Sequence, residues 1–231
     1  MNYAMILSGG TGTRLGNIKP KQYITVANKP VIMYSLEKFE QHNKIDKIII
    51  VASNEWKEYI EKLMTEYSIS KYIGVAQAGK SRQHSILKGL EYAKNQGACK
   101  DDIVIIHDAA RPCVSEKIID DCIDELNVAD GAMPVISVKD TVYMSKDGKH
   151  IDKLLKRDNI YAGQAPESFR FGKYYDANVK LSDEELQKIR GSSEVAFKAG
   201  INIKLFAGEE TNYKITTIED LHKFENECIN Q

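Results

Sequence analysis

Net charge is the first thing that this sequence lacks, since 32 lysines and arginines oppose 33 aspartates and glutamates. Without an excess of basic residues, a protein has no extended positive field that attracts nucleic acid or an anionic membrane surface. We therefore expect no nucleic acid and no membrane as partners. Any site for an anion has to be local.

Cysteine pairs and long apolar runs are also missing. The four cysteines form no C-x-x-C pair and have no histidine at metal-ligand spacing, which argues against a zinc site or a redox motif. We expect reduced thiols in a cytoplasmic protein. No apolar run reaches the roughly 18 residues of a membrane span, and no basic leader precedes the first apolar segment, so we expect neither a span nor a secretory signal.

What the 231 residues do contain is an alternation of short β-rich runs and amphipathic helical patterns. Apolar strands separated by helices are typical of an α/β fold with a mostly parallel sheet flanked by helices. No linker-like segment divides the chain, so we predict a single domain over residues 1–231. The predicted strands are Ala4–Leu7, Lys47–Ala52, Tyr72–Gln77, Ile103–His107, Ala132–Val138 and Ile201–Phe206; the predicted helices lie near 30–39, 56–67, 86–93 and 118–126, and a last one starts at Thr217.

One segment, at about 139–168, breaks this alternation. Val142 and Met144 alternate with polar residues, Asp147-Gly148 is a hairpin turn signal, and an apolar segment returns at 151–155. We predict that an inserted β-hairpin forms an arm here.

Glycine is concentrated in residues 9–16, directly after the first predicted strand. Glycines let the backbone approach a phosphate closely, and the carboxyl ends of parallel strands are where ligands bind in such sheets. Arg14 and Lys21 add positive charge nearby. The spacing departs from G-x-G-x-x-G because Gly16 comes one place late, which disfavours NAD.

A second phosphate-loop pattern, G-x-x-x-x-G-K-S, occupies residues 74–81, and Ile103–Asp108 resembles a Walker B strand. However, Gly74 falls inside the predicted strand Tyr72–Gln77 rather than after a strand. This interpretation also leaves residues 9–16 without a role. A P-loop NTPase and an inactive nucleotide-binding module are the alternatives from other classes.

Five motifs taken together resemble the cytidylyltransferases of sugar-alcohol phosphates, in the family's order and over essentially the whole chain. They are Gly9–Arg14, Pro20–Tyr23 (PKQY), Gly79–Ser85, His107–Pro112 (HDAARP) and Asn212–Asp220. The resemblance implies a Rossmann-like nucleotidyltransferase fold and transfer of CMP from CTP to an alditol phosphate, with release of pyrophosphate and Mg²⁺ as the cofactor. It also implies a homodimer, because the family's hairpin arm reaches a neighbouring subunit.

The resemblance further implies roles for individual residues. Arg14, Lys21 and Lys214 match catalytic cations that contact the nucleotide's phosphates. The nucleotide-binding positions are Leu7, Ser8, Gly9, Gly10, Thr11, Gly12 and Thr13 in the triphosphate loop, with Gly79 and Ser85 in the loop that reads cytosine. The substrate-binding positions are Asp108, Arg111, Thr141 and Arg157, and Asp108 is also the expected Mg²⁺ ligand, since magnesium prefers carboxylate oxygens. We interpret Arg82 as structuring its loop and His107 as a packing or hydrogen-bonding residue.

Two departures from the family pattern fall on the acceptor side. Gly163–Phe169 (GQAPESF) stands where the family usually shows QTPQ-F, and Arg190–Glu194 (RGSSE) replaces a Thr-Asp-Asp/Glu-Ala stretch. By resemblance, that threonine helps to bind the substrate phosphate, a role open here to Ser192, Ser193 or Arg190. The GQ of Gly163-Gln164 favours a ribitol-5-phosphate-like polyol phosphate as the acceptor. The alternative acceptor is 2-C-methyl-D-erythritol 4-phosphate of isoprenoid synthesis.

Overall fold

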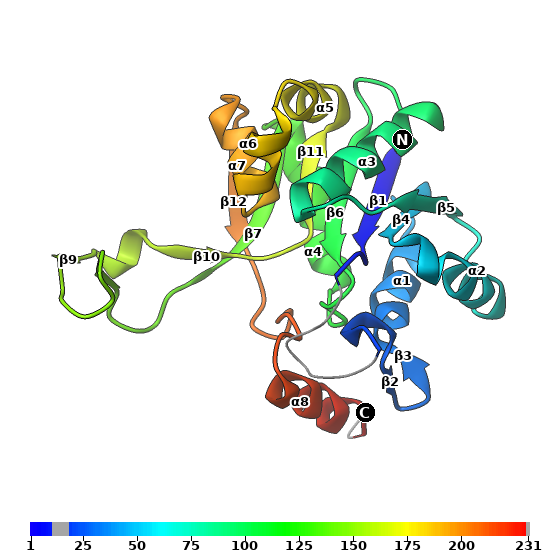
Figure 1. Ribbon diagram of the computed structural model, residues 1–231, viewed down its shortest axis with the longest axis horizontal. Helices are drawn as coiled ribbons and strands as arrows, with labels where there is room; N and C mark the ends of the chain where they lie inside the picture. The colour runs from blue at the N-terminus through cyan, green and yellow to red at the C-terminus, as the bar shows by residue number, and fades with distance from the viewer. Residues whose placement is uncertain (11–18, 230–231) are drawn as a thin grey trace.

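The computed structural model describes residues 1–10 and 19–229, and its centre is an eight-stranded sheet (Figure 1). The strand order is β10-β7-β11-β6-β1-β4-β5, and β12 pairs with β7. All six expected strands are present: β1 (Asn2–Leu7), β4 (Lys47–Ala52), β5 (Tyr72–Gln77), β6 (Ile103–Asp108), β7 (Gly131–Ser137) and β12 (Ile203–Ala207). They share one direction, whereas β10 (Tyr161–Gly163) and β11 (Glu167–Arg170) run against them. The expected α/β fold with a mostly parallel sheet is confirmed.

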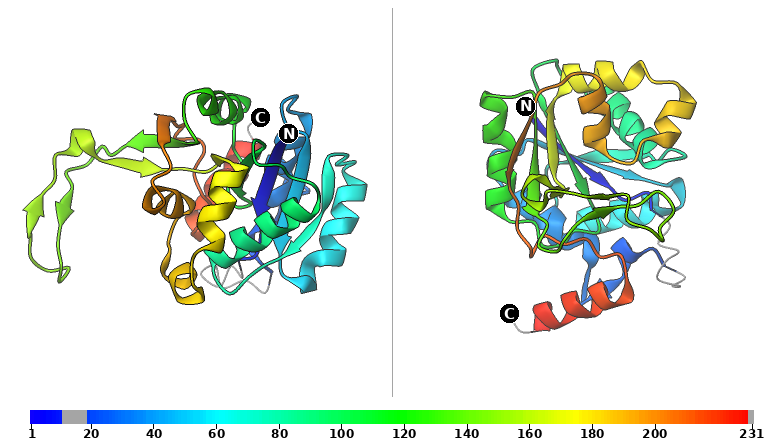
Figure 2. Two further views of the ribbon diagram at one scale, coloured as in Figure 1. Left: turned by 90° about the horizontal axis from the view of Figure 1, so that it is seen from above. Right: turned by 90° about the vertical axis from the view of Figure 1, so that its left-hand side faces the viewer.

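Helices cover both faces of this sheet (Figure 2). In β1, Ala4 and Ile6 pack into one apolar cluster, whereas Tyr3 and Met5 pack into the other, because successive side chains of a strand point to opposite faces. Helices α1 (Val31–Gln41), α2 (Lys57–Glu66) and α4 (Glu116–Asp124) pack on the first side; α3 (Arg82–Asn95), α5 (Phe171–Val179) and α7 (Ser192–Lys198) pack on the second. Both faces are buried, as near-continuous apolar strands predict.

Several helix starts and short elements complete the fold. Pro30 directly precedes α1 instead of being its first residue, a shift of one position. Helix α6 (Asp183–Lys188) starts with a capping box formed by Ser182 and Glu185. The remaining short segments are the ribbon β2 (Thr25–Val26) with β3 (Lys29–Pro30), and the 3-10 turns η2 (Lys21–Tyr23), η3 (Asn54–Trp56), η4 (Glu125–Asn127) and η5 (Arg157–Asn159).

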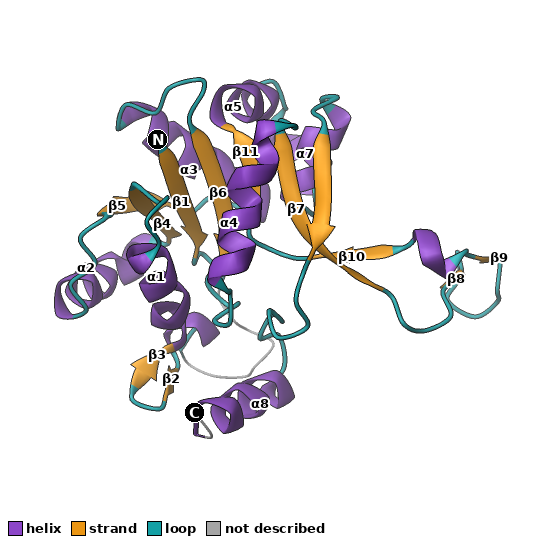
Figure 3. Ribbon diagram, turned by 180° about the vertical axis from the view of Figure 1, so that it is seen from behind, coloured by secondary structure: helices purple, strands orange, loops and turns teal. Residues whose placement is uncertain are grey.

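The hairpin arm projects from the body of the molecule (Figure 3). Its tip is the antiparallel pair β8 (Tyr143–Met144) and β9 (Lys153–Leu154), on either side of the expected turn. The expected range of the arm extends too far, however, because the chain is buried again from Gln164 onward and β11 lies between β6 and β7.

Helix α8 (Ile218–Ile229) closes the described chain. Its expected cap is present, because the Thr217 hydroxyl accepts from the Asp220 backbone and the Asp220 carboxylate accepts from Thr216 and Thr217. Leu221 and Phe224 are buried in a third apolar cluster. All four cysteines are free thiols. Within the described part of the chain, no helix combines the length and apolar character needed to traverse a bilayer.

Candidate active site

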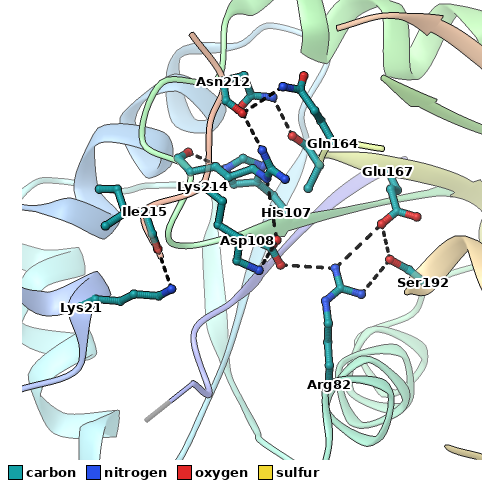
Figure 4. A network of polar contacts seen from close by, with 12 residues as sticks. Lys21, Arg82, His107, Asp108, Gln164, Glu167, Ser192, Asn212, Lys214 and Ile215 are labelled. Carbon is teal, nitrogen blue, oxygen red and sulfur yellow. Dashed lines mark hydrogen bonds and ion pairs between the residues drawn. The ribbon is translucent and has the colours of Figure 1, made fainter. Parts of the chain in front are cut away.

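Asp108 is the centre of a polar cluster at the carboxyl end of β6 (Figure 4). Each of its oxygens faces a cation: Oδ1 lies 3.3 Å from Arg82 Nη2, and Oδ2 lies 2.9 Å from Lys214 Nζ. Burial alone would raise the pKa of Asp108, but the charges of Arg82 and Lys214 outweigh burial and hold this pKa well below its ordinary value. Asp108 is therefore an ionised carboxylate with a protein cation beside each oxygen, and because a carboxylate offers about four lone-pair sites, each oxygen can accept a further partner.

Arg111 and His107 hold the turn that follows β6. Arg111 Nη1 donates to the backbone oxygen of Asn212 at 2.6 Å, and its Nε lies 3.9 Å from Asp108. His107 is fully buried, and its Nε2 donates to the Arg111 backbone oxygen at 2.9 Å. Burial lowers the pKa of His107 to about 4. The expectation that His107 serves packing and hydrogen bonding agrees with these contacts, and Arg111 braces the loop while it faces Asp108.

The late loop brings Lys214 to the carboxylate. The Ile215 backbone N–H donates to Ala110 O at 2.8 Å, which fixes this loop against the turn after β6. Lys21 Nζ donates to the Ile215 backbone oxygen at 2.5 Å. Lys21 and Lys214, separated by almost two hundred residues, therefore reach the same edge of the sheet, as the resemblance implies.

The start of the glycine loop lies beside this cluster, because Leu7 at the end of β1 pairs with Asp108 in the sheet. Gln22 of the PKQY motif donates to the backbone oxygens of Ser8 and Gly10, at 2.8 and 2.9 Å. A Cβ on Gly9 would come 2.7 Å from the Ala78 Cβ, so only glycine fits there. The expected positions Thr11, Gly12, Thr13 and Arg14 lie outside the described residues.

Residues of the second predicted nucleotide loop, Gly79–Ser85, form hydrogen bonds with one another. The Gly79 backbone N–H donates to Ser85 Oγ at 3.0 Å, and the Ser85 hydroxyl donates to the Ser81 backbone oxygen at 2.9 Å. Ser81 in turn caps α3. Ser85 therefore fixes the shape of this loop, and its contact with a base stays a prediction.

A chain of contacts begins at Asp108 and runs through three residues outside the expected site residues: Arg82, Ser192 and Glu167. Arg82 Nη1 donates to Ser192 Oγ at 2.9 Å, and the Ser192 hydroxyl donates to Glu167 Oε1 at 2.5 Å. Arg82 Nη2 also lies 3.9 Å from that oxygen. Burial raises the pKa of Glu167, although Arg82 opposes the shift. An acidic residue at position 167, in a segment that is otherwise apolar or neutral, is the sequence signal that pointed here.

The family model described as IspD, 2-C-methyl-D-erythritol 4-phosphate cytidylyltransferase, matches residues 3–227. The chain belongs to the IspD family. It is therefore a CTP-dependent cytidylyltransferase, and the family resemblance read from the sequence is confirmed.

Several relatives match this IspD-family chain over nearly its whole length. A ribitol-5-phosphate cytidylyltransferase from Lactiplantibacillus plantarum is 33% identical over 226 residues, which cover 96% of this chain and 95% of the relative. The crystal structure of a 4-diphosphocytidyl-2C-methyl-D-erythritol synthase from Anaerococcus prevotii has a TM-score of 0.82 at 26% identity, covering 100% of this chain and 96% of that one. The 2-C-methyl-D-erythritol 4-phosphate cytidylyltransferase of Francisella tularensis has a TM-score of 0.80 at 27% identity, covering 96% and 97%.

Two predicted substrate-binding residues of this IspD-family enzyme are not brought to Asp108 within one subunit. Thr141 and Arg157 are exposed on the arm, and Arg157 Nη1 donates to the Lys139 backbone oxygen at 2.8 Å. The arm leads away from the edge of the sheet that carries Asp108 (Figure 1). Within one subunit, the structure therefore does not bring these two residues to Asp108.

The P-loop alternative is wrong for this IspD-family enzyme. Gly74 lies inside β5 with φ +137°, and a Cβ there would come 2.0 Å from the Tyr92 hydroxyl oxygen. The glycine is therefore required by packing in a strand, whereas a Walker glycine belongs to a loop after a strand. Lys80, the supposed Walker lysine, is exposed and lies 3.3 Å from Asp183.

The described residues offer a magnesium ion one carboxylate rather than a cage. Within residues 1–10 and 19–229, no three His, Cys, Asp or Glu side chains gather as a metal-binding group. Mg²⁺ in nucleotide enzymes is commonly held by one or two carboxylates together with substrate phosphates and water. Asp108 fits that mode of binding.

Proposed function

We propose that this IspD-family enzyme transfers CMP from CTP to a polyol phosphate resembling ribitol 5-phosphate, giving a CDP-alditol and pyrophosphate. The observation that carries this proposal is the group of cations at one edge of the sheet, in which Lys214, Arg82 and Arg111 face the carboxylate of Asp108 and Lys21 reaches the same loop. Such a surplus of positive charge suits a reaction whose substrates are a triphosphate and a monophosphate.

In the proposed reaction, an oxygen of the acceptor's phosphate attacks the α-phosphorus of CTP. The new phosphorus–oxygen bond forms as the bond between the α-phosphorus and the bridging oxygen breaks, and pyrophosphate leaves with the electron pair. Lys21 and Lys214 neutralise charge on the nucleotide's phosphates, a role that the resemblance also gives to Arg14. Positioning and charge stabilisation are sufficient for such a transfer, so no covalent nucleophile is needed.

The glycine loop from Leu7 to Thr13 is proposed to hold the triphosphate through backbone N–H groups, and the loop of Gly79 and Ser85 to hold the base. Asp108 is proposed to receive a hydroxyl of the acceptor and to hold Mg²⁺ together with the phosphates. When bound, Mg²⁺ would draw phosphate oxygens together and withdraw charge from them.

A cavity supports the position of the acceptor. It has a volume of about 520 Å³ at the root of the arm, and its lining includes Arg111, Lys139, Gln164 and Tyr213. Arg111 borders this cavity and faces Asp108 on its other side. A small sugar-alcohol phosphate matches such a site, which combines polar groups with a cation.

The choice of acceptor is proposed from the sequence identity of this chain to its relatives. Identity is 33% with the ribitol-5-phosphate enzyme and 25–27% with four of the solved structures of the methylerythritol branch. The second candidate acceptor is 2-C-methyl-D-erythritol 4-phosphate, favoured by the description of the matching family model.

The arm is proposed to make a homodimer in which Thr141 and Arg157 complete the substrate site of the other subunit. Apolar side chains at the arm's tip support this proposal, because Tyr143, Met144, Ile151 and Leu154 are all exposed in a single subunit. Such a group of apolar side chains is usually covered by a partner.

A pyrophosphate-release assay tests the function. CTP is offered with the phosphates of ribitol, arabinitol, mannitol, glycerol and methylerythritol, each with Mg²⁺. We expect the highest kcat/KM with ribitol 5-phosphate. Preference for methylerythritol phosphate would move the enzyme to the isoprenoid branch, and release with none of the five would overturn the proposal.

A further inference from the structure

Glu167 is a buried carboxylate that the proposed reaction does not use. It begins β11, where it pairs with Ile106 two residues before Asp108, and its side chain is 8% exposed. A buried carboxylate is costly unless it is paired with charge and hydrogen-bond donors. Its partners therefore indicate what it does.

The side-chain contacts of Glu167 involve Arg82, directly or through Ser192. The Ser192 hydroxyl receives a hydrogen bond from Arg82 Nη1 and donates one to Glu167 Oε1, while Arg82 Nη2 lies 3.9 Å from the same oxygen. Figure 4 shows the guanidinium between the two acids, with Glu167 and Ser192 on one side and Asp108 on the other. Arg82 is thus shared between the two acids, and its Nη2 donates to Asp108 Oδ1 at 3.3 Å.

Sharing Arg82 in this way limits how tightly it holds Asp108. A guanidinium with one carboxylate partner prefers a bidentate pair with two parallel hydrogen bonds. Here the contacts of Arg82 are divided, because Nη1 donates to Ser192 and Nη2 lies beside Asp108 Oδ1, while Asp108 Oδ2 accepts from Lys214. The pair of Arg82 with Asp108 is therefore not the bidentate one. We propose that Glu167, acting through Ser192, is a positioning residue that holds Arg82 back from Asp108 and thereby keeps the Asp108 carboxylate available to the acceptor side of the site.

This inference rests on the proposed function for its kinetic consequence. Without the negative charge of Glu167, Arg82 moves onto Asp108 as a bidentate partner, and Asp108 is no longer available to the acceptor. In the proposed function, CTP is held by the glycine loop, Lys21 and Lys214, whereas Glu167 acts on Arg82. Loss of Glu167 therefore lowers kcat and leaves the affinity for CTP nearly unchanged.

The test compares Glu167→Gln, Ser192→Ala and the double variant with the wild type, in pyrophosphate release and in calorimetric binding of CTP. We expect kcat to fall roughly tenfold or more in each single variant, and the Kd for CTP to stay within about threefold. Because both residues act through Arg82, we expect the double variant to be no slower than the slower single variant. The matched control is Asp102→Asn, which removes another buried carboxylate just before β6, where Asp102 binds the N-terminus and Cys99 N; its kcat is expected to remain near that of the wild type.

A kcat within about twofold of the wild type in Glu167→Gln and Ser192→Ala would overturn the inference, as would parallel, multiplicative losses in the double variant. A crystal structure of Glu167→Gln supplies a readout that does not depend on turnover. We expect both Nη atoms of Arg82 on Asp108, and an unmoved Arg82 would overturn the inference. If the wild type transfers CMP to no acceptor, the proposed function fails, and the position of Arg82 still decides this inference.

Discussion

Lys21 is the single side chain whose removal most directly tests the proposed chemistry. It follows Pro20 in the turn η2, and its Nζ reaches the Ile215 backbone oxygen beside Lys214. If Lys21 stabilises charge on the α-phosphate in the transition state, Lys21→Ala should lower kcat by about a hundredfold or more. Its circular dichroism and melting temperature should stay close to those of the wild type.

Lys19→Ala is the matched control for this measurement. Lys19 lies two residues earlier, and its Nζ contacts the hydroxyl and ring of Tyr59 instead of the site. Near-normal turnover in Lys21→Ala would remove this lysine from the mechanism, whereas equal losses in both variants would point to a change in the segment as a whole.

His107 makes the stability of the fold sensitive to acid. Burial lowers its pKa to about 4, whereas an exposed histidine has a pKa of about 6.5. The unfolded chain therefore takes up the proton first, and the free energy of unfolding falls as the pH drops from about 6.5 to about 4. The stabilisation from neutral His107 is fully present above about pH 6.5, and about 2 kcal/mol of it is lost at pH 5.

Urea denaturation at pH 7 and pH 5 checks this prediction. His107→Gln cannot gain a proton, so the decrease between the two pH values should be smaller by about 2 kcal/mol than in the wild type. An identical decrease in the two proteins would contradict the prediction.

At the level of single residues, the sequence named several polar residues that the structure brings together, but it did not give their contacts. Lys21, Asp108, Arg111 and Lys214 were predicted, and the structure brings them to one edge of the sheet. The contacts of Arg82 were not predicted, because its partners Asp108 and Ser192 lie 26 and 110 residues away in the chain. No local spacing reveals such a contact.

Strand β5 contains Gly74, the first glycine of the Walker-like pattern, and packing within the fold accounts for a glycine at this position. Gly74 combines a positive φ with a close contact to the Tyr92 hydroxyl, which itself donates to the Ile73 backbone oxygen at 2.8 Å. We expect Gly74→Ala to lower the free energy of unfolding by about 2 kcal/mol or more, since backbone strain adds to the clash. Urea denaturation measures the loss.

Gly97→Ala is the control for β5, because Gly97 also has a positive φ but its Cβ would meet no atom within 4 Å. Its cost should be that of the backbone alone, about 1 kcal/mol. An equal cost in both variants would show that Tyr92 plays no part. Lys80→Ala should leave turnover unchanged, and loss of activity there would revive the Walker interpretation.

The elements that were predicted and those that were missed differ in composition. The predicted strands are runs of apolar residues, and their periodicity is sufficient to identify them. Strand β11 escaped prediction because its sequence, ESFR, is mostly polar. Its burial depends on tertiary partners, such as the bond from the Ser168 hydroxyl to the Cys122 backbone oxygen at 2.5 Å. Helices α5 to α7 have no comparable apolar run and were not foreseen.

For the molecule as a whole, the arm raises the question of how many chains build one site. Lys21 and Lys214 lie together in one subunit, whereas Arg157 is on the arm that leads away from them. If the arm serves its neighbour, each site in the proposed dimer combines Lys21 of one subunit with Arg157 of the other. Defects in these two residues should then complement each other in a mixed dimer.

Mixing two inactive variants, Lys21→Ala and Arg157→Ala, tests this arrangement. Random exchange makes half of the dimers mixed, and one site in each mixed dimer is intact, so roughly a quarter of wild-type activity should return. The matched mixture of Lys21→Ala with Lys214→Ala should stay inactive, because both lysines come from the same subunit and every site keeps a defect. Sedimentation velocity on each mixture, with Leu154→Asp at the arm's tip as the monomer reference, establishes that dimers are present. If exchanged dimers are present and activity does not return, Arg157 does not belong to the neighbour's site. The proposed arrangement would have given each mixed dimer one intact site, and that site would have restored turnover.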